Sequence, residues 1–112
     1  MIQEKFERTW QQIGLQLQCK SSLVAFEPIN EPPATTAEHA ALTNAFNSLF
    51  VTAMVFTGGY NSLRVVTLIG PGMDGAKTTQ WFVPPKLTNP WALQYHYYSP
   101  CKKSLRIGAQ TQ

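Results

Sequence analysis

The sequence predicts an α/β fold in which short parallel strands alternate with helices. Three apolar stretches, at residues 23–29, 64–70 and 91–98, are rich in β-branched or aromatic residues and are bounded by proline or glycine. Two longer stretches, at residues 3–19 and about 37–56, repeat their apolar residues with the period of a helix. Strands that alternate with helices are typical of parallel β/α units, because a parallel pair needs a crossover connection.

The first helix is expected over residues 3–19, because its apolar residues return every three or four positions. One stripe joins four of them along a single face of the helix: Phe6, Trp10, Ile13 and Leu17. The stretch at 23–29 follows as a strand, because it is almost continuously apolar and holds β-branched Val24 and Ile29. Such a strand is typical of a parallel sheet that is covered on both faces.

The second helix is expected over about residues 37–56. Thr35 and Glu38 have the spacing of a capping box, so Thr35 is the expected N-cap. Gly58 or Gly59 is expected to end the helix, since glycine accepts the left-handed conformation of a C-terminal cap. The apolar stripe that this helix is expected to bury consists of Leu42, Phe46, Leu49 and Ala53.

Two more strands and a short helix are expected in the second half. Residues 64–70 form a buried strand, residues 76–83 a short helix that Pro84 and Pro85 end, and residues 91–98 the third strand. Side chains of a strand alternate between its faces. One face of the third strand is bulky and is expected to contact covering helices: Trp91, Leu93, Tyr95 and Tyr97. The other is small or polar and is expected to face a barrel interior or a cleft: Ala92, Gln94, His96 and Tyr98.

A carboxylate follows the first strand, in the stretch "AFEPINEPP", Ala25 to Pro33. By the same alternation, Glu27 and Glu31 share one face, and Glu31 emerges inward at the carboxyl end of the strand. Glu27 is expected to be a polar residue of the barrel core, hydrogen-bonded to its neighbours. Taken alone, a glutamate after a strand is more often a solvated loop charge, and a lone histidine such as His96 is more often structural.

Composition and charge bound the possible functions. The chain has 112 residues, of which 44% are hydrophobic, which suits a single packed domain. Nine basic residues face six acidic ones, but three of the basic residues lie in the last twelve, so the rest of the chain is neutral. Neither nucleic acid nor a membrane is therefore an expected partner. The apolar runs are too short for a membrane span, and the first residues do not resemble a signal peptide.

Cysteine and histidine positions give no sign of a metal centre. No pair of them has the spacing of metal ligands, so neither a metal nor a cofactor is expected. Cys19 and Cys101 lie far apart in the sequence and neither establish nor exclude a disulfide.

The motif "FEPINEP", Phe26 to Pro32, together with the later "HYY", His96 to Tyr98, resembles glycoside hydrolase family 5. The family consists of retaining glycosidases with a (β/α)8 barrel, and the resemblance looks closest to fungal-type glucanases. It runs from about Phe6 to Pro100. It implies that residues 1–100 form the central part of such a TIM barrel, with about three parallel strands and flanking helices, and that residues 101–112 are a divergent basic tail.

The resemblance also implies a chemistry. Enzymes of this family hydrolyse O-glycosidic bonds in β-glucans by double displacement, which needs an acid/base and a nucleophile. By resemblance Glu31 is the acid/base, Asn30 hydrogen-bonds the sugar 2-hydroxyl or the nucleophile, and His96 and Tyr98 belong to the floor of the site. A β-glucan or a related oligosaccharide is the expected partner. Full-length relatives are expected to be secreted.

The chain departs from the family in one decisive way. The family's nucleophilic glutamate lies on a later strand, and the residues after Pro100 contain no acidic side chain. The nucleophile is therefore expected to be missing from this chain, and the chain alone is expected to be inactive. The alternative is a non-catalytic α/β fragment that binds carbohydrate or a partner protein through the same cleft.

Overall fold

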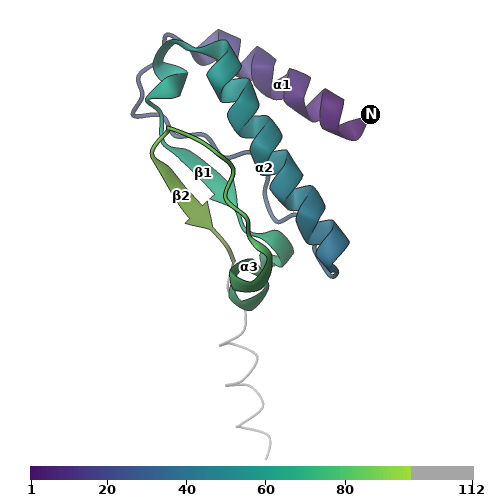
Figure 1. Ribbon diagram of the computed structural model, residues 1–112. Helices are drawn as coiled ribbons and strands as arrows, with labels where there is room; N and C mark the ends of the chain where they lie inside the picture. The colour runs from purple at the N-terminus through teal and green to yellow at the C-terminus, as the bar shows by residue number, and fades with distance from the viewer. Residues whose placement is uncertain (97–112) are drawn as a thin grey trace, which may run out of the picture.

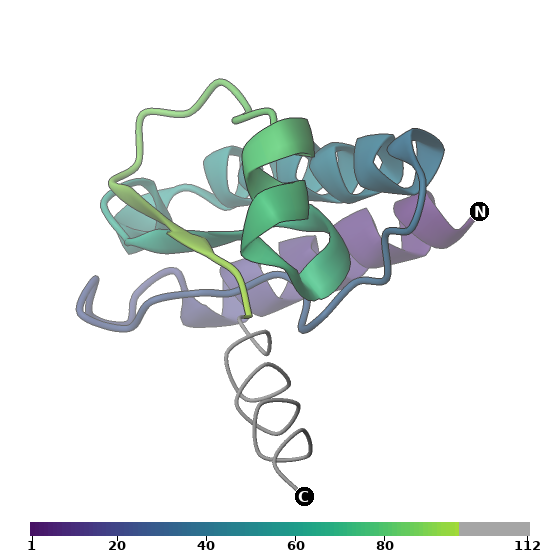
Figure 2. The same cartoon turned by 90° about the horizontal axis from the view of Figure 1, so that it is seen from below.

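Two long helices lie side by side on one side of a small parallel sheet (Figures 1 and 2). The computed structural model describes residues 1–96. Helix α1 (Ile2–Leu17) and helix α2 (Ala37–Thr57) pack against each other. Strand β1 (Val66–Ile69) pairs with strand β2 (Trp91–Gln94), and the short helix α3 (Gly75–Trp81) lies in the crossover between them. The expected alternation of strands and helices is therefore present.

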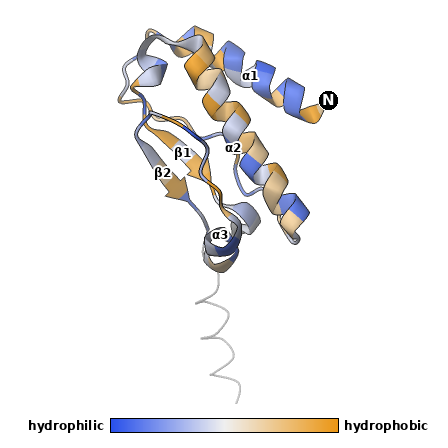
Figure 3. Ribbon diagram, viewed as in Figure 1, coloured by the Kyte–Doolittle hydropathy of each residue, from blue (hydrophilic) through white to orange (hydrophobic). Residues whose placement is uncertain are grey.

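Two 3-10 helices complete these elements. Helix η1 (Gly59–Ser62) follows α2, and helix η2 (Pro71–Met73) follows β1. Hydrophobic residues run along β1, whereas α1 is mostly hydrophilic (Figure 3). Cys19 is exposed, while Cys101 and the tail at 101–112 lie outside the described residues.

The sheet is parallel, with Val66 opposite Trp91 and Ile69 opposite Gln94. On the other side of β1, the backbone N–H of Phe26 donates to Val65 at 3.2 Å, and the N–H of Thr67 donates to Phe26 at 2.8 Å. The segment around Phe26 therefore runs parallel to β1, on the side away from β2, as expected.

The expected strand at 23–29 is nevertheless reduced to a single parallel bridge between Phe26 and Val66. Pro28 explains the loss, because proline has no backbone N–H with which to continue a ladder. The prediction of a strand of that length was wrong, whereas its place beside β1 and its direction were right.

Aromatic side chains join α1 to the core. The Trp10 ring lies edge-on to Phe50, with centroids 4.7 Å apart, and 5.8 Å from Phe26. The Phe6 ring lies edge-on to Phe46 at 4.8 Å. The expected stripe of α1 thus faces α2 and the buried cluster that also contains Met54.

Replacing Gly14 by alanine is expected to lower the free energy of unfolding by about 1–3 kcal/mol. A methyl group at Gly14 would lie 2.6 Å from Oγ1 and 2.8 Å from Cγ2 of Thr57, because α1 and α2 approach closely there. The higher helix propensity of alanine, worth at most roughly 1 kcal/mol, offsets only part of this overlap. Urea unfolding followed by circular dichroism measures the effect.

The matched control is Leu15→Ala, since Leu15 is exposed on the same helix and should change stability by less than about 1 kcal/mol. A Gly14→Ala chain as stable as the parent would contradict the close approach of the two helices.

Helix α2 differs from expectation at its start. Its N-cap is Thr36, whose hydroxyl accepts from the backbone N–H of His39, so the predicted cap Thr35 was wrong by one residue. A hydrogen bond with Thr36 also lowers the pKa of the exposed Glu38 carboxyl below its ordinary value. The end agrees with expectation, because Gly58 and Gly59 both have positive φ, 60° and 58°.

The buried face of α2 is also wider than the predicted stripe. Of the predicted residues, Ala53 is fully buried, but Leu42 is 43% exposed. The helix packs against both α1 and β1, so it buries residues on two sides rather than along one line. Its buried residues are Ala40, Thr43, Asn47, Phe50, Val51, Ala53, Met54 and Thr57.

Among the described helices, α2 alone has the length and apolar character that a membrane crossing requires, and 44% of that stretch is buried in the fold. Its packing against α1 and β1 accounts for these apolar residues as those of a core helix.

The outer face of β2 and the residue after it is only partly covered in the described part of the chain: helix α3 lies beside Leu93 and Tyr95. Trp91, Leu93 and Tyr95 are 44%, 38% and 51% exposed. The ring of Phe82 lies 6.1 Å from that of Trp91, but no described helix lies across all three side chains. The alternation was right, and the prediction that helices cover this face is met only in part among the described residues, by α3.

A buried arginine fastens the loop between α1 and Phe26. Arg64 has no exposed surface, and its guanidinium lies 4.5 Å from the centroid of the Phe26 ring. Its Nε donates to Asn61 Oδ1 at 3.1 Å. Its two terminal nitrogens donate at 2.6–3.0 Å to four backbone carbonyls, those of Leu17, Lys20, Ser21 and Val24. One side chain therefore donates hydrogen bonds to backbone carbonyls at the end of α1 and in the loop that leads to the site.

Candidate functional site

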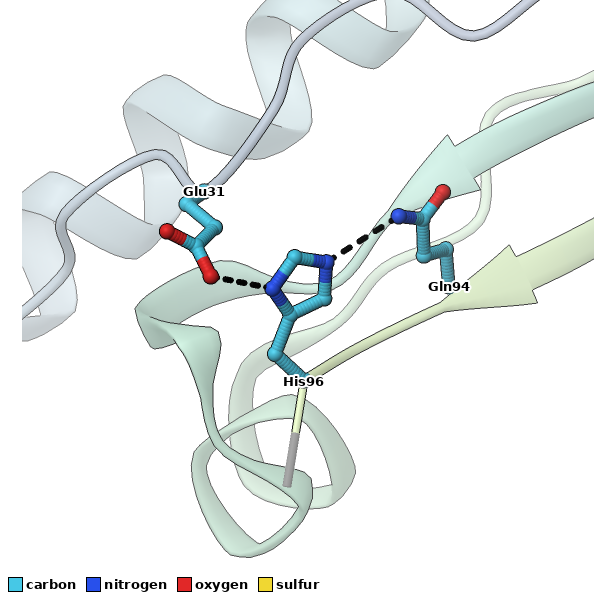
Figure 4. Close-up of polar contacts among 3 residues, drawn as sticks. All are labelled: Glu31, Gln94 and His96. Carbon is cyan, nitrogen blue, oxygen red and sulfur yellow. Dashed lines mark hydrogen bonds and ion pairs between the residues drawn. The ribbon is translucent and has the colours of Figure 1, made fainter. Parts of the chain in front are cut away.

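A glutamate and a histidine from distant parts of the chain meet beyond the carboxyl ends of the parallel segments (Figure 4). Glu31 follows the segment around Phe26, and His96 lies two residues past the end of β2. Because neighbouring parallel strands end at the same edge of a sheet, the two side chains point to the same place. Glu31 Oε1 and His96 Nδ1 form a hydrogen-bonded contact, which is an ion pair when the ring is protonated.

The backbone of Glu31 is held in an uncommon conformation. Its φ angle of +45° is the only positive one of a non-glycine residue among residues 1–96. Side chains other than glycine, asparagine and aspartate rarely adopt this region, and such a residue costs on the order of 1–3 kcal/mol. Such strain is concentrated at functional sites, which makes Glu31 a candidate for one.

The pair is only partly covered. The side chains of Glu31 and His96 are 31% and 23% exposed. A ligand can therefore reach the carboxylate, while its partner fixes its orientation. This combination of access and orientation is what a general acid or base requires.

Gln94 completes the arrangement from the last position of β2. Its Nε2 lies 3.1 Å from Nε2 of His96, so the imidazole ring is held between Gln94 and Glu31 (Figure 4). Sequence reasoning placed Gln94 on the face of His96 but gave it no role. The signal was available in the alternation of the strand, since residues two apart lie side by side on one face.

The other predicted site residues are not all part of this cluster. Asn30 is exposed and lines a groove beside Glu31. Tyr98 lies outside the described residues. Glu27 is exposed, so the expectation that it is a hydrogen-bonded core residue was wrong for this chain, because no described segment covers its face.

The groove beside Glu31 has a volume of about 540 Å³ and lies between the loop at 29–33 and helices α1 and α2. Its walls are largely apolar, with Phe6, Leu42 and Phe46 among them. Within residues 1–96, no cluster of three or more metal-ligating side chains is present. Beside this groove, the contact between Glu31 and His96 supplies a carboxyl group oriented by a histidine.

Comparison with known proteins connects this geometry to carbohydrate hydrolysis. The chain is 30% identical to a xyloglucan-specific endo-β-1,4-glucanase of Bacteroides ovatus, over 88% of this chain but 22% of that protein. No protein-family model matches the sequence.

Solved structures agree with this match. The Bacteroides ovatus GH5 xyloglucanase, in complex with a XXXG heptasaccharide, superposes on 88% of this chain with a TM-score of 0.79 and 30% identity. A broad-specificity GH5-4 endoglucanase from Bacteroides salanitronis gives a TM-score of 0.81 at 25% identity over 90% of the chain. A glycoside hydrolase family 5 enzyme from Prevotella bryantii, in complex with a xyloglucan tetradecasaccharide, gives 0.78 at 27% over 87%.

The match is to a part of each relative. The chain spans 23% of the Bacteroides ovatus structure, 30% of that from Bacteroides salanitronis and 31% of that from Prevotella bryantii. These three relatives are bacterial, so they give no support to the expectation of a fungal-type glucanase.

Proposed function

Because this chain belongs to glycoside hydrolase family 5, as a part of its barrel, we propose that it supplies the acid/base side of an active site that hydrolyses β-glucans with retention of configuration. The observation that carries the proposal is the contact between Glu31 and His96 at the carboxyl edge of the parallel segments. Barrel enzymes place their chemistry at that edge.

Glu31 has two tasks in this proposal. As an acid it protonates the glycosidic oxygen when the bond breaks, and as a carboxylate it later takes a proton from the attacking water. His96 orients the carboxyl group in both steps by a hydrogen bond to Oε1. The partial exposure of Glu31 leaves room for the sugar oxygen and then for the water.

The nucleophile has to come from elsewhere in the barrel. A retaining pair of carboxyl groups lies about 5–5.5 Å apart across the scissile bond. The six acidic residues of the chain are Glu4, Glu7, Glu27, Glu31, Glu38 and Asp74. Two belong to α1, Glu38 to α2, and Asp74 accepts the first backbone N–H groups of α3. We assign the nucleophile to a part of the barrel that these 112 residues do not include.

The proposed substrate is a β-1,4-linked glucan backbone. This choice is supported by two of the relatives, a xyloglucan-specific endo-β-1,4-glucanase at 30% identity and a family 5 enzyme in complex with a xyloglucan tetradecasaccharide at 27%. Asn30, which is exposed next to Glu31, is the proposed contact for a sugar hydroxyl, and Tyr98 belongs to the same proposed site.

In a complete barrel, Glu31→Ala is expected to reduce turnover of xyloglucan by on the order of 100-fold or more, since general acid/base catalysis contributes roughly 10²–10⁴. The barrel is obtained by replacing the matching part of the Bacteroides ovatus enzyme with this chain. An aryl cellobioside with an acidic leaving group should lose much less activity, because its departure does not need a proton.

The matched control in the same chimera is Glu27→Ala, which removes an exposed carboxylate four positions away. It should retain turnover within a few-fold. Equal losses from both substitutions, or a folded chimera whose activity survives Glu31→Ala, would contradict the proposed role.

A further inference from the structure

The imidazole of His96 has a partner on each ring nitrogen, and the two partners differ in kind. Nδ1 faces a carboxylate oxygen of Glu31, which only accepts hydrogen bonds when ionised. Nε2 faces the side-chain nitrogen of Gln94 at 3.1 Å. An amide nitrogen only donates, so Nε2 of the ring has to accept from it.

These partners select one neutral form of the ring. The proton lies on Nδ1 and is donated to Glu31, while the lone pair of Nε2 receives the N–H of Gln94. The opposite tautomer would set two donors against each other at Nε2 and two lone pairs against each other at Nδ1. The charged imidazolium would also carry a proton on Nε2, directed at the amide N–H group.

We propose that Gln94 is a positioning residue that holds His96 in its neutral, Nδ1-protonated form, so that His96 donates to Glu31 and does not take its proton. The inference rests on the proposed acid/base role of Glu31 and deepens it. If Nδ1 carried no proton, it would be a base in contact with the carboxylic acid of Glu31. The proton that the leaving group needs would then move from Glu31 to His96.

The carboxyl group has two oxygens for two purposes in this arrangement. Oε1 receives the hydrogen bond from His96, and the second oxygen points away from the ring (Figure 4). The same hydrogen bond to Oε1 persists when Glu31 becomes a carboxylate, so the carboxyl group keeps the same orientation in both steps of the reaction.

Substitution by glutamate separates this role from simple packing. Gln94→Glu keeps the size and shape of the side chain but replaces the N–H donor by an acceptor. The ring then lies between two carboxylates, and we expect it to become protonated on both nitrogens. Gln94→Leu removes the donor without adding an acceptor, so we expect a mixture of the two neutral tautomers.

The test is a long-range proton–nitrogen correlation spectrum of the ¹⁵N-labelled 112-residue chain, because the shifts of the two ring nitrogens identify the tautomer. At about pH 8 the parent should show His96 protonated on Nδ1 and unprotonated on Nε2. In Gln94→Glu at the same pH both ring nitrogens should carry a proton, because an ionised carboxylate then faces each of them.

Two controls accompany the measurement. His39 is exposed on α2, so its signals should be the same in all variants. Gln80→Leu, at an exposed position of α3, should leave His96 unchanged. The same spectrum can be recorded at low protein concentration if a variant is poorly soluble.

An Nε2-protonated ring in the parent, or a His96 ring that keeps a bare Nε2 in Gln94→Glu, would overturn the inference. Neither readout depends on turnover. A failed tautomer prediction with an active chimera would refute the role of Gln94 alone, whereas an Nδ1-protonated ring in a chimera insensitive to Glu31→Ala would refute the proposed function.

Discussion

The 112-residue chain is expected to hydrolyse β-glucan on the order of 10⁴-fold or more slowly than the chimeric barrel that contains it, since loss of a nucleophile removes most of the rate enhancement of a covalent mechanism. Glu27 is the acidic residue nearest to Glu31 in the sequence. A retaining pair of carboxyl groups lies about 5–5.5 Å apart and an inverting pair roughly 6.5–9.5 Å. Glu27 is exposed on a face that no described segment covers, whereas Glu31 contacts His96, so we do not expect Glu27 to serve as the second carboxyl group.

The measurement compares the purified chain and the chimera, at equal concentration, on xyloglucan, barley glucan and carboxymethyl cellulose. A chain that carries Glu31→Gln gives the background rate. Clear turnover by the parent chain that this variant abolishes would show that a second carboxylate reaches the site, from this chain or from another copy. In that case the conclusion that the nucleophile is missing would be wrong.

Arg64→Met is expected to lower the free energy of unfolding by at least about 2 kcal/mol. The substitution removes the guanidinium donor from the carbonyls of Lys20 and Val24, whereas those of Leu17 and Ser21 keep a backbone N–H donor, and each unsatisfied buried group costs roughly 1–3 kcal/mol. Small domains are stable by only about 5–15 kcal/mol, so the loss is a large fraction of the total. Arg64→Lys should fall in between, because an ammonium group cannot donate to all of these carbonyls together.

The matched control is Arg8→Met on α1. Arg8 forms an exposed ion pair with Glu4 at 2.8 Å, and such pairs contribute at most about 1 kcal/mol. Urea unfolding of the three variants and the parent gives the comparison. Equal effects at Arg64 and Arg8 would mean that the guanidinium of Arg64 does not organise the loop between α1 and Phe26.

The helices were predictable from the sequence because their signals are local. The apolar period located α1 and α2 to within a few residues, and the prolines at 84 and 85 marked the region where α3 ends. The first strand was overestimated because apolar content outweighed Pro28, whose missing N–H limits pairing to one bridge. The N-cap was misplaced because Thr35 and Thr36 are both good caps, and the choice depends on the angle at which the chain enters α2.

The site was predictable where alternation and motif agreed. The alternation of side chains along the strands predicted that Glu31 and His96 point to the same face of the sheet, at the carboxyl ends of the strands. In the structure the two side chains are in contact. Alternation also placed Gln94 beside His96, but which ring nitrogen faces Gln94 and which faces Glu31 could not be predicted from the sequence. Arg64 was not singled out either, because the four carbonyls that make its burial favourable belong to the end of α1 and the loop after it, 40–47 positions away in the sequence.

The positive φ of Glu31 has a consequence for how this position can change over time. A glycine there would relax the backbone, so random substitution screened for stability alone favours loss of the carboxyl group. Retention of glutamate at such a position therefore requires selection for what its side chain does. If one library of variants were selected separately for thermal stability and for sugar hydrolysis, the two selected sets would differ most at position 31.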